Sequence, residues 1–336
     1  MVSEKLLPEA GAGIDCGTGN FVSSRQIGKK IILNRIRNAF IDLPMEHKRM
    51  LKLSKTSFFE YSGKLVVIGD DALATANLFN RESRRPMKGG IIASGELEAQ
   101  EIIGLIMKTM LGEPSIINER CCYSVPAIAV DTEGSDITYH QAILGKIITE
   151  IGFQPIPVNE SLAIIFSECA KENFSGLGVS YGAGMTNICL AYNTLSALEF
   201  SLNKGGDFVD IGASKAVGTT AAKICSIKEN NLFDMNNPIS REQEAIVLYL
   251  QTLIDYTIKN IIQHFSKVKR DIMIPKPIPI IISGGTSLAK GFVDKFKERF
   301  ELNQKDFPIS ISEIRPAADP ITAVAAGLLM VSQAED

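Results

Sequence analysis

Gly-Ile-Asp-Cys-Gly-Thr-Gly-Asn, at residues 13–20, is the stretch of this sequence that decides the fold. Two more glycine-rich turns follow: Gly-Val-Ser-Tyr-Gly-Ala-Gly-Met-Thr at 178–186 and Ile-Ser-Gly-Gly-Thr-Ser-Leu at 282–288. Glycine tolerates positive φ and has no Cβ, so such turns can point several backbone N–H groups at a phosphate. One turn alone is equally typical of an ordinary hairpin. Three in this order, each after a short apolar run, predict two similar domains that close on one phosphate-bearing ligand.

Length and composition predict a folded protein with two domains. The chain has 336 residues, which is more than one hydrophobic core usually serves. Hydrophobic residues make up 45% and charged residues 22%, as in a globular protein. The formal net charge of −3 supplies no basic surface, so we expect no nucleic-acid partner. The basic stretch at residues 81–88 is expected to be a solvated loop.

The sequence also predicts a cytoplasmic protein without direct membrane insertion. No stretch approaches the roughly 18 consecutive apolar residues of a membrane span. Residues 1–10 lack the apolar core of a signal peptide, and Leu6 and Leu7 are too few to anchor the chain. The six cysteines contain no CxxC pair, which favours buried reduced thiols over zinc ligands or disulfides.

Apolar periodicity predicts a repeated order of strands and helices. The first half is expected to have strands at 11–16, 21–27, 30–36, 65–68, 121–125 and 155–158, and helices from 70, over 95–111 and 137–151, and from 160. The second half is expected to have strands at 177–180, 187–192, 197–202 and 278–283, and helices over 208–222, 241–264 and 292–300. Both halves open with a strand, a glycine turn and a strand, which indicates an internal duplication.

The first two glycine turns carry the residues expected to bind phosphate. One cradle is formed by Gly17, Thr18, Gly19 and Asn20, and the other by Gly182, Ala183, Gly184, Met185 and Thr186. Asp15, at the end of a strand, is expected to hold magnesium through its water shell, because Mg²⁺ favours one or two carboxylates plus phosphate oxygens. The chain lacks both the P-loop motif and a GxGxxG motif opening a helix, which argues against P-loop and dinucleotide folds.

The arrangement of these motifs resembles the actin, DnaK-chaperone and sugar-kinase superfamily, and the resemblance covers nearly the whole chain. Residues 13–20 resemble its first phosphate motif, residues 178–186 its second, and residues 282–291 its adenosine motif. Shorter stretches similar to actin or MreB lie at 68–72, 88–92 and 319–327. The size, and Val22 where actin has a phosphate-binding lysine, bring the chain closest to MreB- and MamK-type prokaryotic actins.

This resemblance implies an α/β fold of duplicated actin-like (ribonuclease H-like) domains. Mixed sheets would be flanked by helices, with the nucleotide in the cleft between the domains. Domain I would comprise residues 1–158 and 315–336, with a small insertion at about 31–70. Domain II would comprise residues 159–314, with an insertion at about 208–275.

The resemblance also implies a site for ATP or ADP with Mg²⁺. Glu160 matches the carboxylate that positions the attacking water, although the local sequence alone favours an acidic first-turn residue that complements the helix dipole. Expected nucleoside contacts are Gly205, Gly206 and Asp207 near the ribose, and Lys228, Glu229, Gly284, Gly285, Thr286 and Ser287 near the adenine. Taken alone, Lys228 and Glu229 are also compatible with a solvated helix end.

Ser180 departs from the pattern of the superfamily. An Asp usually stands there and supports the magnesium-bound waters from the second domain. A neutral hydroxyl can still hydrogen-bond a water but supplies no charge. We therefore expect weaker magnesium dependence, slower hydrolysis, or both, and we expect Ser180→Asp to change the ATPase rate or the nucleotide affinity.

The resemblance implies an ATP-binding cytoskeletal protein that assembles with itself into filaments and is a slow ATPase. Nucleotide state would control domain closure, and a head-to-tail contact that does not close into a ring would make the filament. An adaptor or cargo is left open. The alternatives are a non-polymerising scaffold like FtsA or PilM, a chaperone-like ATPase, and a small-molecule kinase with Asp131 as its base.

Overall fold

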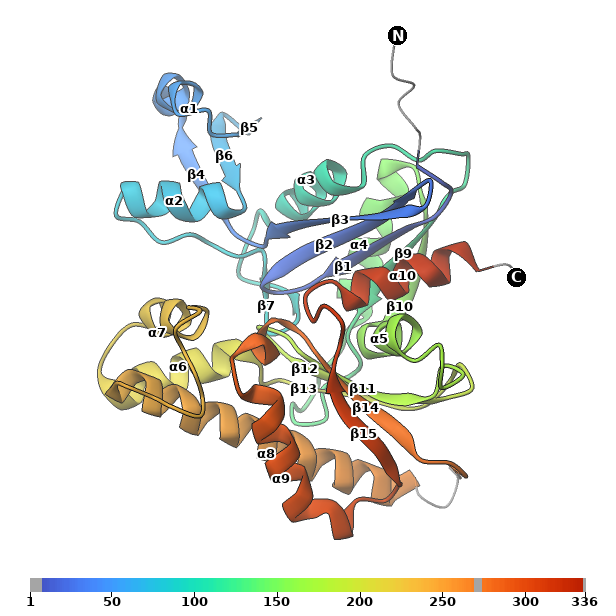
Figure 1. Ribbon diagram of the computed structural model, residues 1–336. Helices are drawn as coiled ribbons and strands as arrows, with labels where there is room; N and C mark the ends of the chain where they lie inside the picture. The colour runs from blue at the N-terminus through green and yellow to red at the C-terminus, as the bar shows by residue number, and fades with distance from the viewer. Residues whose placement is uncertain (1–7, 269–273, 335–336) are drawn as a thin grey trace.

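The computed structural model describes residues 8–268 and 274–334, and its ribbon has two lobes (Figure 1). Leu6 and Leu7 lie outside the described residues. The first lobe is built on a mixed sheet in the order β10-β9-β1-β2-β3. Its strands are β1 (Ala12–Cys16), β2 (Asn20–Ile27), β3 (Lys30–Arg37), β9 (Arg120–Val125) and β10 (Gln154–Asn159). The buried faces of α3 (Ala99–Leu111) and α4 (Thr138–Ile151) share one hydrophobic core with this sheet.

The second lobe repeats this topology. Its sheet has the order β13-β12-β11-β14-β15, which is the order of the first sheet read from its other edge. The strands are β11 (Gly176–Tyr181), β12 (Thr186–Tyr192), β13 (Leu195–Leu202), β14 (Ile278–Ser283) and β15 (Ile311–Pro316). In each sheet the leading strand pairs antiparallel with the next strand and parallel with a later one. The predicted fold of duplicated domains with mixed sheets is thus confirmed.

Smaller elements extend both lobes. A three-stranded sheet in the order β4-β6-β5 carries its own small core, and a two-stranded sheet pairs β7 with β8. These elements are β4 (Phe40–Pro44), η1 (Met45–His47), α1 (Lys48–Leu53), β5 (Phe59–Tyr61), β6 (Lys64–Ile68), α2 (Asp70–Leu78), β7 (Met87–Lys88) and β8 (Ile91–Ile92). The second lobe adds α6 (Gly206–Val217), α7 (Ala221–Lys228), α8 (Arg241–Val268), η2 (Gly285–Leu288), α9 (Phe292–Asn303) and η3 (Gln304–Asp306). The domain boundaries proposed from the sequence stay a prediction.

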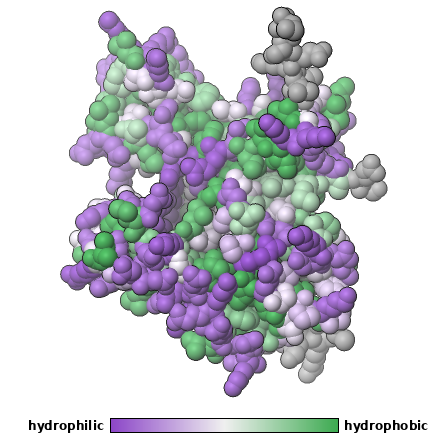
Figure 2. All heavy atoms as spheres, viewed as in Figure 1, coloured by the Kyte–Doolittle hydropathy of each residue, from purple (hydrophilic) through white to green (hydrophobic). Residues whose placement is uncertain are grey.

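Two helices join the lobes. α5 (Glu160–Glu168) and α10 (Ala323–Gln333) lie side by side between the two sheets (Figure 1). A Cβ added to Gly327 would overlap the carbonyl oxygen of Ala163, so only glycine allows this close crossing of the helices. To one side of the pair the surface is hollowed, between the small three-stranded sheet and the α6–α7 segment (Figure 2).

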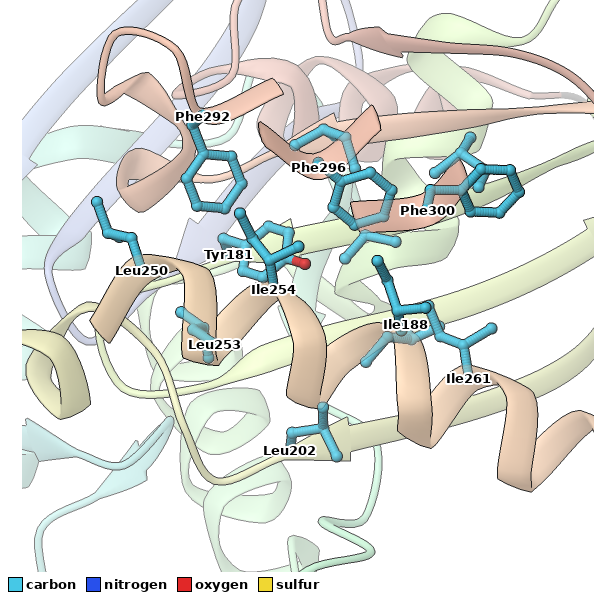
Figure 3. Close-up of a cluster of buried hydrophobic side chains, with 14 of the residues drawn as sticks. Tyr181, Ile188, Leu202, Leu250, Leu253, Ile254, Ile261, Phe292, Phe296 and Phe300 are labelled. Carbon is cyan, nitrogen blue, oxygen red and sulfur yellow. The ribbon is translucent and has the colours of Figure 1, made fainter. Parts of the chain in front are cut away.

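Apolar residues at helical spacing in α9 form part of the core of the second lobe. Phe292, Phe296 and Phe300 recur every four residues along α9, so their rings line one face. In Figure 3 the rings of Phe292 and Phe296 lie close to Tyr181 of the sheet and Ile254 of α8. The same core also contains Phe300, Leu250, Leu253, Ile261, Ile188 and Leu202. This packing anchors β11, the strand that leads into the second glycine turn.

Several local expectations need correction. The helix expected from residue 95 begins at Ala99, because residues 93–99 form turns closed by Glu96 N to Ala93 O and Ala99 N to Glu96 O. The single helix expected at 208–222 is two helices. Gly218, with φ of +72°, ends α6, and the Thr220 hydroxyl caps α7. No helix of the described chain is long and apolar enough to span a membrane.

Candidate functional site

The three glycine turns meet at one cavity of about 570 Å³ between the lobes. Most of the predicted site residues line it: Asp15, Gly17, Thr18, Gly19, Asn20, Glu160, Ser180, Gly182, Ala183, Gly184, Met185, Gly206, Asp207, Lys228, Glu229, Gly284, Gly285 and Thr286. The structure therefore brings together residues as distant in the chain as Asp15 and Thr286.

Three predicted residues lie behind the wall of the cavity. The Thr186 hydroxyl donates to the Lys204 carbonyl at 2.8 Å, and the Ser287 hydroxyl donates to the Gly284 carbonyl at 2.7 Å. A Cβ on Gly205 would lie 2.6 Å from the carbonyl oxygens of Gly182 and Ala183. These residues shape the turns, but they do not face the cavity.

The two predicted phosphate cradles face each other at close range. A Cβ added to Gly184 would lie 2.7 Å from Thr18 Oγ1 and 2.5 Å from the backbone nitrogen of Gly90. The Gly90 N–H also donates to Thr18 Oγ1 at 2.9 Å, and a Cβ at Gly90 would overlap Met185. The turn at residues 88–90 therefore contacts both cradles, a position that the sequence did not indicate.

Asp15 lies one residue before the end of β1 and lines the cavity. The Ser124 hydroxyl on the neighbouring strand donates to Asp15 Oδ1 at 2.7 Å and accepts from the Cys16 N–H at 2.8 Å. Burial raises the pKa of Asp15, and the bond from Ser124 partly opposes this rise. A divalent cation bound here would stabilise the ionised carboxylate.

Asn20 adds a further acceptor at the same end of the cavity. Its side-chain oxygen is buried and has no hydrogen-bond partner among the described residues. A metal-bound water would satisfy that oxygen, since such waters are hydrogen-bond donors. Asp15 and Asn20 thus fit a hydrated Mg²⁺ ion, whereas no cluster of three or more His, Cys, Asp or Glu occurs in the described chain.

Glu160 is held at the start of α5, opposite Asp15. The Asn159 side chain caps this helix by accepting from the N–H groups of Ser161 and Leu162. Glu160 Oε1 accepts from Ser180 Oγ at 2.5 Å, and Oε2 accepts from Asn187 Nδ2 at 2.7 Å. Burial, followed by the negative charge of Asp15, raises the pKa of Glu160, while the bond from Ser180 lowers it.

Arginines of the first lobe reach across the mouth of the cavity. Arg85 Nη1 contacts both carboxylate oxygens of Asp207, at 2.9 and 3.1 Å. Arg37 pairs with Asp70 at 3.0 Å and with Glu229 at 3.2 Å. The expectation that residues 81–88 form a solvated loop is wrong at Met87, which is buried in β7, whereas Arg85 is exposed. Both arginines were missed, because their partners lie far away in sequence.

Lys228 forms a buried ion pair with Asp210. Its Nζ donates to Asp210 Oδ1 at 2.7 Å and to the Gly206 carbonyl at 3.3 Å. Only 8% and 7% of the Lys228 and Asp210 side chains are exposed. The pair ties α7 to the start of α6, and so fixes the loop that was expected to approach the ribose. No sequence pattern pointed to Asp210.

Asp131, the base required by a kinase, lies outside the residues that line the cavity. Its Oδ1 accepts from the Asn203 N–H at 2.8 Å, and its Oδ2 accepts from the Tyr256 hydroxyl at 3.1 Å. Both carboxylate oxygens of Asp131 therefore already accept hydrogen bonds from the protein itself. Five of the six cysteines are buried, and Cys225 is half-buried; all are unpaired.

Two lobes of equivalent topology around a polar cleft with three glycine turns define a protein of the actin-like fold. The chain belongs to the Volactin family, whose model matches residues 11–332. No curated protein matches the sequence at a significant level.

Solved structures share this fold over nearly the whole chain. The MamK double helical filament is 19% identical with a TM-score of 0.70, covering 97% of this chain and 99% of MamK. A non-polymerising MamK mutant bound to AMPPNP is 19% identical with a TM-score of 0.57, covering 96% and 98%. MreB5 of Spiroplasma citri bound to ADP is 14% identical with a TM-score of 0.63, covering 94% of each chain. At these identities the likeness establishes the actin-like fold and nothing more.

Proposed function

We propose that this protein binds ATP in the cleft, assembles with itself into filaments and hydrolyses ATP slowly in the cytoplasm. The observation that carries the proposal is the meeting of two glycine cradles across one cavity, with Asp15 and Glu160 at its floor. The cavity volume of about 570 Å³ falls in the range of small-molecule sites, roughly 300–1,000 Å³. Relatives of the same fold have been solved with ADP or AMPPNP, which supports a nucleotide as the ligand.

Different residues of the cleft would bind the phosphates and the nucleoside. The backbone amides of Gly19 and Gly184 would point at phosphate oxygens from two sides. Those of Gly17 and Gly182 close the turns instead, because they donate to the Asn20 and Met185 carbonyls. Asp207 and Glu229 would border the nucleoside, where Arg85 and Arg37 already contact them. Gly284 has φ of +90° and directs η2 along the wall of the cavity, where the base would pack.

Hydrolysis would depend on the two carboxylates. Asp15, with Asn20, would hold the water shell of a magnesium ion, which when bound neutralises phosphate charge. Glu160 would orient a water for in-line attack on the γ-phosphate. Ser180 supplies no charge from the second lobe and its hydroxyl is engaged by Glu160, so we expect the reaction to be slow.

The filament is proposed from the fold it shares with the MamK double helical filament. The test is high-speed pelleting and negative-stain microscopy with ATP, ADP, AMPPNP or no nucleotide, beside a phosphate-release assay. Filaments that require a nucleotide, with slow phosphate release, support the proposal. If the protein binds nucleotide but forms no polymer in any of the four conditions, a non-polymerising scaffold is supported instead. A protein that binds no nucleotide would refute both the filament and the scaffold proposals.

A further inference from the structure

We propose that Ser180 and Asn187 are positioning residues that fix the orientation of the Glu160 carboxylate toward the attacking water. The inference rests on the proposed hydrolysis of ATP and assigns the residues that make Glu160 effective in this chain. It differs from the expectation for Ser180 as a substitute for a metal-supporting Asp, because here the hydroxyl serves the neighbouring carboxylate.

Ser180, Asn187 and Ser201 form one row across the second sheet. Ser180 on β11 is the register partner of Asn187 on β12, and Asn187 is the register partner of Ser201 on β13. Register partners on adjacent strands present their side chains on the same face of a sheet. The exposed fractions of these residues are 1%, 2% and 0%, so the row is withdrawn from bulk water.

The hydrogen bonds along the row have a fixed direction. The Ser201 hydroxyl donates to Asn187 Oδ1, which leaves Nδ2 of the same amide to donate to Glu160 Oε2 at 2.7 Å. The Ser180 hydroxyl donates to Glu160 Oε1 at 2.5 Å. The Glu160 carboxylate is therefore held by one donor on each oxygen, and its plane and rotamer are both fixed.

This arrangement leaves Glu160 able to accept a hydrogen bond from the attacking water. When Glu160 is ionised, its carboxylate offers about four acceptor positions, and the row uses one on each oxygen. Glu160 lines the cavity, so the remaining acceptor positions are accessible to a water there. Both donors are neutral and add no charge beside Asp15 and Glu160. An Asp at position 180 would instead place a further carboxylate against Glu160, and would repel it.

Ser23 provides a matched control for Ser180. It is also a buried strand serine, 1% exposed, and it lies on β2 of the first sheet. Its hydroxyl donates to the Met110 carbonyl at 3.3 Å and not to Glu160. Ser180→Ala and Ser23→Ala thus remove the same group from buried strand positions, but only the first removes a bond to Glu160.

The experiment measures single-turnover phosphate release and equilibrium nucleotide affinity for the same set of full-length variants. We expect Ser180→Ala and Asn187→Leu each to lower the rate about 10-fold, while the dissociation constant for ATP changes less than about twofold. Ser23→Ala should retain the wild-type rate, and Ser180→Thr, which keeps the hydroxyl, should recover most of it. In a Glu160→Gln background, Ser180→Ala should cause no further loss, because its effect passes through Glu160.

The outcomes separate this inference from the proposed function. A wild type that fails to bind ATP refutes the proposed function itself. A wild type that hydrolyses ATP, with Ser180→Ala as fast as wild type or with Ser23→Ala as slow as Ser180→Ala, refutes the positioning role alone. A Ser180→Ala loss of the same size in the Glu160→Gln background as in the wild-type background would also refute that role, because the effect would then bypass Glu160.

Discussion

Arg85 of the first lobe and Asp207 of the second are joined across the mouth of the cleft, with Arg85 Nη1 at 2.9 and 3.1 Å from the two carboxylate oxygens. The pair Arg37–Glu229 makes a second connection between the lobes, at 3.2 Å. These side chains are about a quarter to a half exposed, so each pair contributes at most about 1 kcal/mol to stability. Their position suggests a role in holding the cleft closed.

Removal of the Arg85 side chain should loosen the closed cleft. We expect Arg85→Ala to accelerate release of a fluorescent ATP analogue several-fold in stopped-flow measurements, with less than about 1 kcal/mol change in unfolding free energy. Lys223→Ala is the matched control, because Lys223 pairs with Glu242 at 3.1 Å within the second lobe. Equal release rates for wild type and Arg85→Ala would contradict a closing role for the pair.

Gly184→Ala should separate the two cradles. The added Cβ would lie 2.5 Å from the Gly90 nitrogen and 2.7 Å from Thr18 Oγ1, so the turns must move apart. We expect about 10-fold weaker nucleotide binding, equivalent to about 1.4 kcal/mol. Gly95→Ala is the control, since a Cβ at Gly95 meets nothing within 4 Å. Unchanged affinity for Gly184→Ala would argue that the cradles do not grip the ligand together.

Lys228→Met should destabilise the protein even without nucleotide. The change leaves the buried Asp210 carboxylate without its cation, which typically costs about 3 kcal/mol or more. Adding Asp210→Asn should restore most of the loss, and urea unfolding of the nucleotide-free variants measures both effects. If Lys228→Met lowers only nucleotide affinity, Lys228 acts mainly on the nucleoside and the structural assignment is wrong.

His140 should make the protein less stable in acid. Burial lowers the pKa of His140 from 6.5 to about 4, so the folded state keeps the ring neutral. Between these values the unfolded state binds more protons, and stability therefore rises with pH from about 4 to 6.5. His140→Leu should remove up to about 3 kcal/mol of this dependence in urea unfolding across that range. An unchanged pH profile would show that other groups govern the acid transition.

Much of the architecture followed from apolar runs and glycine turns. β1, β11 and β14 are short, almost wholly buried strands that end in glycine-rich turns, and these signals are local. β4, α1 and β5 were missed because each is short, and their core gathers isolated residues such as Leu43, Leu51 and Leu65. β15 was missed because its residues are only partly buried and show no apolar run.

The missed site residues depend on tertiary pairing. Arg85 and Asp207 are 122 positions apart, and Arg37 and Glu229 are 192 apart, so no local pattern joins them. Asn187 offered one signal, since a polar amide inside an otherwise apolar strand indicates a buried hydrogen-bonding role. The strand register then sets Asn187 opposite Ser180, which is information that spacing alone does not contain.

The most direct test of the nucleotide cleft is isothermal titration of the full-length protein with ATP in the presence of Mg²⁺. We predict one site per chain, competition by ADP, and weaker binding for Gly184→Ala than for Gly95→Ala. Heat of binding that is absent up to millimolar ATP, or that is the same for both glycine variants, would contradict the assignment of the cleft as an ATP site.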